Sequence, residues 1–350
     1  MKNLNRFLFS LLAAGTVFSA VSIFAQGDSA GTPYRIVNSA QLMGVGRIDY
    51  VYADNDGRKL YVPRGNAVLA FDMDTLKLAG SITNAQAHGV AVDPQAHHGF
   101  CSSKPVVMWD SQTLEKIKTI DVQGGPDAIA FEPLTEHVFV LSHSEPNATV
   151  LDGKDGSILG TIDLGGQPEQ AVSDENGHLY INLENKDSIA VVDVKAMKLI
   201  ATYSLGGKGG GPAGLALDAK NHVLFSFCAE PNVVVILNAD DGKILTTLPI
   251  GNGNDSATFN PATMEAFGSQ RDGTLTVIKE TSPTAFEVEQ TVQTKEGAKT
   301  CTLDTKKNQV IVITLERPAG TPKPPANEDR AARRKRASGP GLLDILVIGR

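Results

Sequence analysis

Three features of the sequence predict an all-β fold made of repeated four-stranded units. Between Pro168 and Tyr203, four short apolar segments alternate with clusters of Asn, Asp and Gly, a pattern typical of antiparallel strands joined by tight turns. An acidic or turn-forming residue closes the third segment of each unit, and it recurs at steps of 38 to 45 residues. A repeat of this length and content is typical of a β-propeller. Seven copies, the last one stretched by an insertion, predict seven blades.

The repeats follow one another along the chain without a break. We expect each closing residue to accept hydrogen bonds from the turn that follows it, in which a glycine can adopt positive φ. The closing residues are Asp72, Asp110, Asp152, Asp193, Asn238 and Lys279. The predicted blades span residues 46–82, 87–120, 126–162, 168–203, 212–248, 254–292 and 298–350.

The two ends of the repeat region predict how the ring closes. Residues 34–40 resemble the outermost strand of the other units, whereas the seventh unit contributes only three strands of its own. We therefore expect the N-terminal strand to complete the last blade beside residues 344–348. Such closure removes a sheet edge that would otherwise be open to aggregation.

The N-terminal 25 residues have the three-part layout of a secretory signal peptide. Lys2 and Arg6 precede an apolar run from Phe7 to Val21, and the segment ends in Ile-Phe-Ala (residues 23–25) before Gln26. The run is short for a membrane span, although an N-terminal anchor helix is the alternative. We expect an exported protein, periplasmic or extracellular and cell-surface, with no transmembrane segment in the mature chain.

Composition narrows the classes of function. The chain of 350 residues carries 32 Lys and Arg against 39 Asp and Glu, and removal of Lys2 and Arg6 would leave 30 basic residues. A net acidic chain is not a general nucleic-acid or membrane binder, so any such role needs a local basic patch. The three cysteines lie in non-adjacent blades without metal-binding spacing, and we expect them to be buried and unpaired.

The strand sequences carry a family resemblance. Leu60-Tyr61-Val62 followed by residues 66–72, and Leu179-Tyr180-Ile181-Asn182 followed by residues 188–193, resemble the YVTN-repeat (YncE-like) β-propellers. The resemblance covers nearly all of the mature chain, and it departs at Pro63 and in the long insertion of the seventh unit. It implies export, a seven-bladed ring and a surface or periplasmic setting, and it implies no particular reaction. We expect the protein to be a monomer.

Polar residues recur where the chain enters the innermost strand of each blade. In a propeller these positions ring one mouth of the central channel, and the loops between second and third strands lie on the same face. The candidate ligand-binding residues at the mouth are Asp49, His88, Asp127, Glu169, Asp255 and Lys299, with Ala213 at the seventh position. The same face receives Arg64, His143 and Arg271 from the second-to-third loops.

Two interpretations of this mouth remain open. Carboxylates with an imidazole suit a divalent cation, for which Asp49, His88 and Asp127 from consecutive blades are the candidate ligands. Alternatively, the residues are polar because they face water. A ring of like charges would also raise some carboxylate pKa values, and a raised pKa is one origin of a general base.

The insertion at residues 317–341 interrupts the last blade. It is rich in Pro, Ala, Gly and charge and has no apolar period, so we expect a disordered loop. Its basic arm consists of Arg330, Arg333, Arg334, Lys335 and Arg336. The arm is a candidate contact for nucleic acid, anionic lipid, lipopolysaccharide or an acidic partner, or for the acidic mouth itself; a tolerated surface insertion is the alternative.

Two functional hypotheses follow. The first is an exported, non-catalytic binding or scaffold propeller that engages a partner protein, a polymer or a ligand through the mouth face and the basic arm. The second is a metal-assisted hydrolase or lyase of lactonase-like type that uses the carboxylates and His88 at the mouth. The sequence has no nucleophile-elbow or phosphate-loop motif, which favours the first hypothesis.

Overall fold

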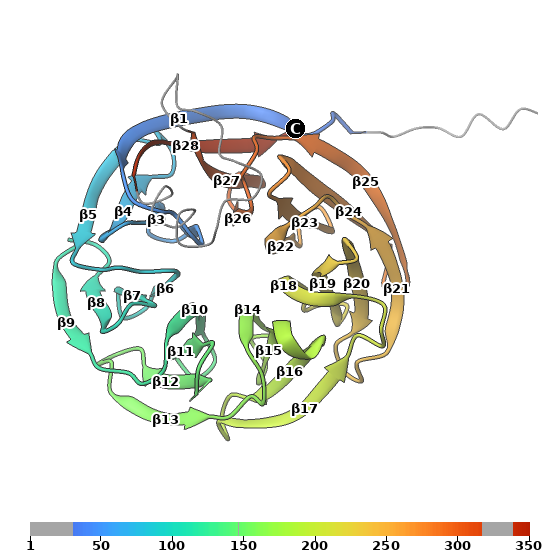
Figure 1. Ribbon diagram of the computed structural model, residues 1–350, viewed down its shortest axis with the longest axis horizontal. Helices are drawn as coiled ribbons and strands as arrows, with labels where there is room; N and C mark the ends of the chain where they lie inside the picture. The colour runs from blue at the N-terminus through green and yellow to red at the C-terminus, as the bar shows by residue number, and fades with distance from the viewer. Residues whose placement is uncertain (1–30, 146, 317–338) are drawn as a thin grey trace, which may run out of the picture. The chain divides into compact units, whose positions relative to one another are not determined.

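The computed structural model describes residues 31–145, 147–316 and 339–350. Residues 33–350 form one compact unit. Within it, seven separate four-stranded antiparallel sheets stand around a common centre, as Figure 1 shows. The predicted seven-bladed β-propeller is therefore confirmed.

Each blade runs from an innermost strand at the channel to an outermost strand at the rim. The first three blades are β2 (Tyr52–Asp54), β3 (Lys59–Arg64), β4 (Ala67–Asp72) and β5 (Leu78–Thr83); β6 (Val90–Asp93), β7 (His98–Cys101), β8 (Val106–Asp110) and β9 (Lys116–Ile120); and β10 (Pro126–Glu132), β11 (His137–Ser142), β12 (Ala148–Asp152) and β13 (Ile158–Ile162). The next two are β14 (Pro168–Ser173), β15 (His178–Leu183), β16 (Ser188–Asp193) and β17 (Lys198–Ser204), with the 3₁₀ turn η1 (Glu184–Lys186), and β18 (Gly210–Asp218), β19 (Val223–Glu230), β20 (Val233–Asn238) and β21 (Ile244–Pro249). The last two are β22 (Asn254–Asn260), β23 (Glu265–Gln270), β24 (Thr274–Ser282) and β25 (Ala285–Gln293), and β26 (Thr300–Asp304), β27 (Gln309–Glu316), β28 (Pro340–Gly349) and β1 (Arg35–Val45).

The residue that closes the third strand organises the turn behind it. Asp72 Oδ1 accepts hydrogen bonds from the backbone and the hydroxyl of Thr75, at 2.7 and 2.8 Å. Asp110, Asp152, Asp193 and Asn238 make equivalent bonds to backbone N–H groups two and three residues later. Each bond satisfies a turn donor that the sheet leaves free. The predicted role of the closing residues in the following turn is therefore confirmed at five of the six positions.

The residue that ends this turn adopts positive φ. Gly156 and Gly242 have φ of 65° and 70° in the third and fifth blades, as the sequence predicts. Leu76, Leu114 and Met197 adopt positive φ at the corresponding position of other blades. Because a side chain makes this conformation costly, these three residues show that the turn geometry is imposed by the surrounding sheet.

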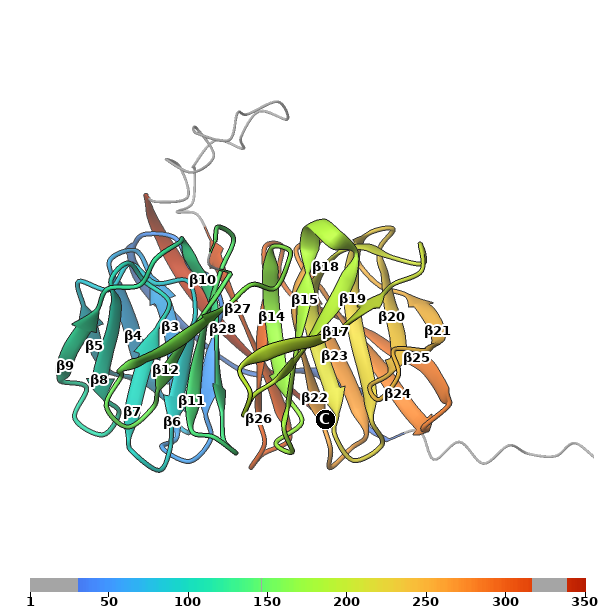
Figure 2. The same cartoon turned by 90° about the horizontal axis from the view of Figure 1, so that it is seen from below.

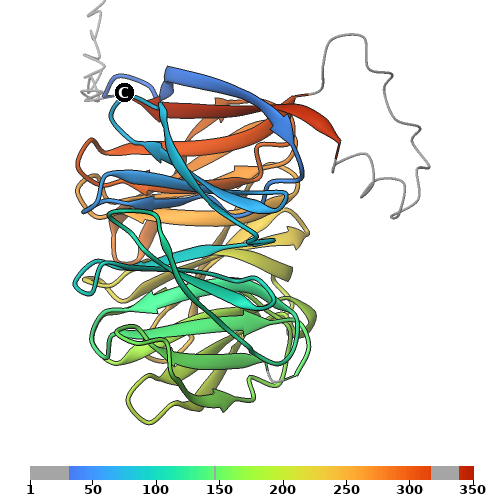
Figure 3. The same ribbon diagram turned by 90° about the vertical axis from the view of Figure 1, so that its left-hand side faces the viewer.

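The first strand of the chain closes the ring. Strand β1 pairs antiparallel with β28 along its length, from Arg35 opposite Gly349 to Val45 opposite Pro340. Figure 3 shows the two strands side by side at the rim. The predicted closure is confirmed, and the closing strand is longer than the predicted residues 34–40.

A cluster at the end of the chain fastens this closure to the neighbouring sixth blade. The Tyr34 hydroxyl donates to Glu265 Oε2 at 2.5 Å, and the Arg350 guanidinium lies 4.4 Å from the centre of the Tyr34 ring. Arg350 also pairs with Glu265 and, at 2.9 Å, with Glu289. Because Glu265 is fully buried, its charge requires these partners.

The cores lie between adjacent blades, which stand face to face as Figure 2 shows. Each apolar cluster joins the facing sides of neighbouring sheets; for example, Val62 and Phe71 of the first blade pack in one cluster with Ile313 and Ile345 of the last. Cys101, Cys228 and Cys301 are buried and unpaired, as predicted. None of the helical segments in the described ranges has the length and apolarity needed to cross a membrane.

Two predicted features lie mostly outside the described residues. These are the signal peptide at residues 1–25 and the insertion, including all five residues of the basic arm. At the end of the insertion the prediction was wrong by two residues, because Pro340 and Gly341 belong to β28 and pair with Val45 and Gly44.

A buried pair of carboxyl groups lies between the fifth and sixth blades. Asp218 and Glu280 are 1% and 3% exposed, and one oxygen of each has no hydrogen-bond partner within the described residues. Burial raises the pKa of Glu280 to about 7; the hydrogen bond from Asn221 opposes this shift, and the negative charge of Asp218 adds to it. The folded protein therefore favours a protonated Glu280.

This pair predicts a pH-dependent stability. Between the ordinary Glu pKa of 4.5 and about 7, the folded state keeps a proton that the unfolded state releases. The stabilisation is therefore complete below pH 4.5 and is lost as the pH rises through 7, at up to about 1.4 kcal/mol per pH unit. We expect Glu280→Gln to remove this loss in urea unfolding curves between pH 5 and 8. Glu287→Gln, on the exposed face of β25, is the control; an unchanged pH profile in Glu280→Gln would contradict the assignment.

Candidate functional site

One residue per blade stands where the chain enters the innermost strand, and these seven are called the leading residues. The structure brings six of them together at one mouth of the channel. Asp49, His88 and Lys299 lie one to three residues before their innermost strands, whereas Asp127, Glu169 and Asp255 are the second residues of β10, β14 and β22. Side-chain contacts join all six, either directly or through one further residue. Ala213, the seventh, is apolar and buried.

Local irregularities in three innermost strands lie at the acidic residues. The pairing register shifts between Pro126 and Ile129, between Pro168 and Ala171, and between Asn254 and Ser256. A β-bulge bends a strand and redirects its side chains, and bulges are common beside functional sites. Proline cannot donate to the ladder, so Pro126 and Pro168 are suited to a position where regular pairing stops.

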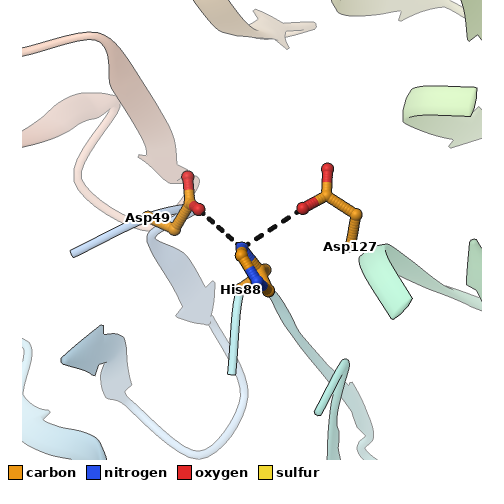
Figure 4. Close-up of side chains that lie close together, drawn as sticks. All are labelled: Asp49, His88 and Asp127. Carbon is orange, nitrogen blue, oxygen red and sulfur yellow. Dashed lines mark hydrogen bonds and ion pairs between the residues drawn. The ribbon is translucent and has the colours of Figure 1, made fainter. Parts of the chain in front are cut away.

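The first part of the site links three consecutive blades. His88 Nδ1 lies 2.8 Å from Asp49 Oδ2 and 3.2 Å from Asp127 Oδ1. Figure 4 shows the two carboxylates approaching this nitrogen from opposite sides. The hydrogen bond with Asp49 raises the pKa of His88 against the effect of burial. Burial alone would raise the pKa of Asp49, but the contacts with His88 and Lys299 lower it overall.

The second part of the site extends the chain of contacts to the fourth blade. His143, in the β11–β12 loop, places Nε2 at 3.4 Å from Asp127 Oδ2 and 3.0 Å from Glu169 Oε1. Glu169 Oε2 accepts a 2.6 Å hydrogen bond from the Tyr50 hydroxyl. The contact with Glu169 raises the pKa of His143 to about 9. Burial raises the pKa of Asp127 to about 6, and the charge of Glu169 adds to this effect.

Lys299 ends the chain of contacts on the other side. Its Nζ contacts Asp255 and lies 3.4 Å from Asp49 Oδ1. Burial lowers the pKa of this ammonium, but the negative charges of Asp255 and Asp49 outweigh that effect and raise it. The result is one arc of alternating acidic and basic side chains, which runs from Asp255 to Glu169.

Sequence reasoning missed Tyr50. Its side chain is half-buried and bonded to Glu169. Loss of hydration raises the pKa of its hydroxyl well above the ordinary value, so the hydroxyl remains a hydrogen-bond donor. Its only sequence signal is its position after Asp49, two residues before the innermost strand β2.

Two cavities adjoin the arc. The channel below it is a cavity of about 510 Å³ that is lined by the innermost strands, including Tyr50, Gln170 and Phe131. Gln170 narrows the channel, because its side chain bonds to the backbone of Leu215 and Ala257 in two other blades. On the mouth face, a cavity of about 350 Å³ is lined by Arg47, Asn66 and Gln86 together with Asp49 and His88.

Two sets of side chains have donor atoms close enough to hold a metal ion. They are Asp49, His88 and Asp127, and Asp127, His143 and Glu169. Within each set, one donor atom from every residue lies within 4.8 Å of the others. The first set contains the three predicted metal candidates, and the second was not recognised from the sequence.

The predicted arginines occupy different places. Arg271 is exposed in the β23–β24 loop, and its positive charge acts on Lys299. Arg64 is 5% exposed, and its guanidinium donates to the carbonyl oxygens of Leu42 at 2.9 Å and Gly341 at 2.6 Å. Arg64 therefore joins the first blade to both strands that close the ring, and its side chain is bonded to these strands and not to the carboxylates of the arc.

Comparisons with known proteins show the fold. No protein-family model matches the sequence, and no curated protein matches it. Among solved structures, that of U3-55K is similar with a TM-score of 0.69 and 11% identity, over 90% of this chain and 99% of the other. The crystal structure of the RRP9 WD40 repeats is similar with a TM-score of 0.67 and 11% identity, over 90% of this chain and 100% of the other. At this identity, the likeness establishes a seven-bladed propeller and no activity.

The position of Arg64 predicts a structural role. We expect Arg64→Met to remove the side-chain donor from the carbonyl oxygens of half-buried Leu42 and buried Gly341, and to lower the free energy of unfolding by about 3 kcal/mol. Chemical denaturation followed by circular dichroism measures this loss. Arg271→Met, an exposed arginine on the same face, is expected to change stability by less than about 0.5 kcal/mol. Equal effects of the two substitutions would contradict this role.

Proposed function

We propose that the protein is an exported, non-catalytic binding propeller that engages its partner or ligand through the mouth face. The observation that carries the proposal is the convergence of six polar residues, from different blades, at one mouth beside a cavity of about 350 Å³. Ligand sites commonly combine such a concave surface with a few convergent polar groups.

The contacts of the two histidines favour binding over covalent catalysis. In the described part of the chain, the polar side-chain partners of the His88 and His143 rings are all carboxylates. No serine, threonine or cysteine side chain is bonded to either ring there, so a paired nucleophile and base is not formed. The three cysteines are buried, and burial raises the pKa of each thiol.

Export and family membership are part of this proposal. They rest on the three-part N-terminal segment and on the resemblance of the strand sequences to YVTN-repeat propellers. The basic arm, Arg330 to Arg336, would add a contact for an acidic partner, a nucleic acid or an anionic lipid. We further propose that the propeller acts as a monomer, because closure within one chain leaves no incomplete blade.

Site-specific cross-linking tests the binding surface. A photo-reactive amino acid at Asn66, on the rim of the mouth cavity, is expected to trap a partner in the exported fraction of cells that express the full chain. The same group at Lys116, on the outer strand β9, should trap none. Arg47→Glu reverses an exposed charge of the cavity and should reduce trapping at least about 10-fold. Equal trapping from both positions, or none from Asn66, would refute the proposal.

The two metal-ligand sets favour a second candidate function, a metal-assisted hydrolase or lyase of lactonase-like type. In this case a bound ion would activate water at the mouth. We expect hydrolysis of aliphatic or aromatic lactones that stops after chelation and returns with added divalent ion. His88→Ala should lower the rate at least about 100-fold. Lactone hydrolysis that is absent with every ion, or unchanged in His88→Ala, would exclude this function.

A further inference from the structure

We propose that the channel mouth binds two divalent transition-metal ions, with Asp127 as the carboxylate that bridges them. The site would join the second, third and fourth blades with the segment before the first. The proposal concerns only the occupants of the mouth, and it stands whether the protein binds a partner or transforms a substrate.

Asp127 is common to both ligand sets and directs one oxygen to each. Its Oδ1 faces His88 at 3.2 Å, and its Oδ2 faces His143 at 3.4 Å. A carboxylate that offers its two oxygens to opposite sides can ligate two ions, and ions in two-metal sites lie about 3.5–4 Å apart. Each ion would then have one imidazole, one terminal carboxylate and one oxygen of Asp127.

Asp49 and Glu169, the carboxylates that would each bind one ion, are oriented by the same kind of contact. Asp49 uses Oδ1 for Lys299, at 3.4 Å, and directs Oδ2 to His88. Glu169 uses Oε2 for the Tyr50 hydroxyl, at 2.6 Å, and directs Oε1 to His143. In each case an outer donor fixes one oxygen and leaves the other turned toward the proposed ion. Such outer hydrogen bonds orient ligands in metal sites.

The His143 ring provides a separate indication of a ligand. Its Nε2 atom is buried and has no hydrogen-bond partner in suitable geometry among the described residues. The two nearby carboxylate oxygens, at 3.0 and 3.4 Å, therefore lie close to the nitrogen without completing an aligned hydrogen bond. Buried polar atoms are rarely left unsatisfied. An ion between this nitrogen and the two oxygens would satisfy all three.

Charge and ligand type indicate the class of ion. Three carboxylates supply three negative charges, which two divalent ions and a bridging hydroxide would balance. One nitrogen and at least two oxygens per ion suit Mn²⁺, Fe²⁺ or Zn²⁺, whereas Ca²⁺ and Mg²⁺ prefer oxygen alone. The remaining positions of each ion would hold water.

Manganese provides a direct test. The full chain is stripped with a chelator, desalted and titrated with MnCl₂ by isothermal calorimetry, and the loaded protein is examined by electron paramagnetic resonance. We expect two ions per chain and the multiline spectrum of an exchange-coupled pair, which requires a shared ligand. One ion or none per chain, or two ions without coupling, would overturn the proposal.

Substitutions then test each part of the site. Asp127→Asn should abolish the coupled spectrum, while His143→Ala and His88→Ala should each leave one ion with an uncoupled six-line spectrum. Tyr50→Phe should weaken one of the two binding events about 10-fold and leave the other unchanged. Glu184→Gln alters a carboxyl near Glu169 that belongs to neither ligand set, and it should retain the coupled pair.

The two histidine variants keep the test decisive if Asp127→Asn fails to fold. Thermal melting of the metal-free proteins establishes which variants are folded. Folded His88→Ala and His143→Ala proteins that both keep the coupled pair would overturn the proposal, as would a loss of coupling in Glu184→Gln. Failure here would leave the cross-linking result at Asn66 unaffected, so the two proposals are separable.

Discussion

The pairing of β1 with β28 is the constraint on which the rest of the structure depends. It joins residues about 300 positions apart in the sequence, from Arg35 opposite Gly349 to Val45 opposite Pro340. The other six sheets form from consecutive strands, so each depends on local turns alone. This sheet and the apolar cluster shared by the first and seventh blades hold those two blades side by side. Arg64 and the cluster around Glu265 reinforce the closure from the two neighbouring blades.

Closure of the ring determines the chemistry of the mouth. The leading residues of successive blades are about 40 positions apart in the sequence, and a flexible chain would keep their charges separate. The ring instead places Lys299 of the last blade beside Asp49 of the first, at 3.4 Å. A ring that opened at this point would separate these two groups and leave Asp49 with His88 as its remaining basic partner, so the site and the closure are coupled.

Much of the fold could be predicted because the same strand and turn pattern recurs in every repeat. The Asp72-type turn needs only a side-chain oxygen and a few following N–H groups, and those requirements are visible in the sequence. The mouth positions also followed from counting along the repeat. The bulges at Asp127 and Glu169, and the hydroxyl of Tyr50 behind Glu169, depend on how neighbouring sheets meet, and no local pattern encodes this. Arg64 was misplaced for the same reason: an arginine in a loop reads as solvent-exposed until the strands that cover it are known.

At the channel mouth, the buried and half-buried carboxylates are paired with basic or hydroxyl side chains. Carboxylates that only faced water would not need such partners. Hydrated carboxylates on a surface need no partners, and exposed ion pairs add little stability. Here Glu169 and Asp49 have side chains that are only 10% and 15% exposed, so each depends on a neighbouring donor. Histidine supplies a positive charge only while it is protonated, and two of the cations in the arc are histidines. Metal ions would replace those protons without moving the carboxylates, because Lys299 and Tyr50 already hold the outer oxygens in place. Under the proposed two-metal site, the same framework would be held together by protons before the ions bind and by the ions afterwards. The bulged strands and outer donors would supply the rigidity that both states need.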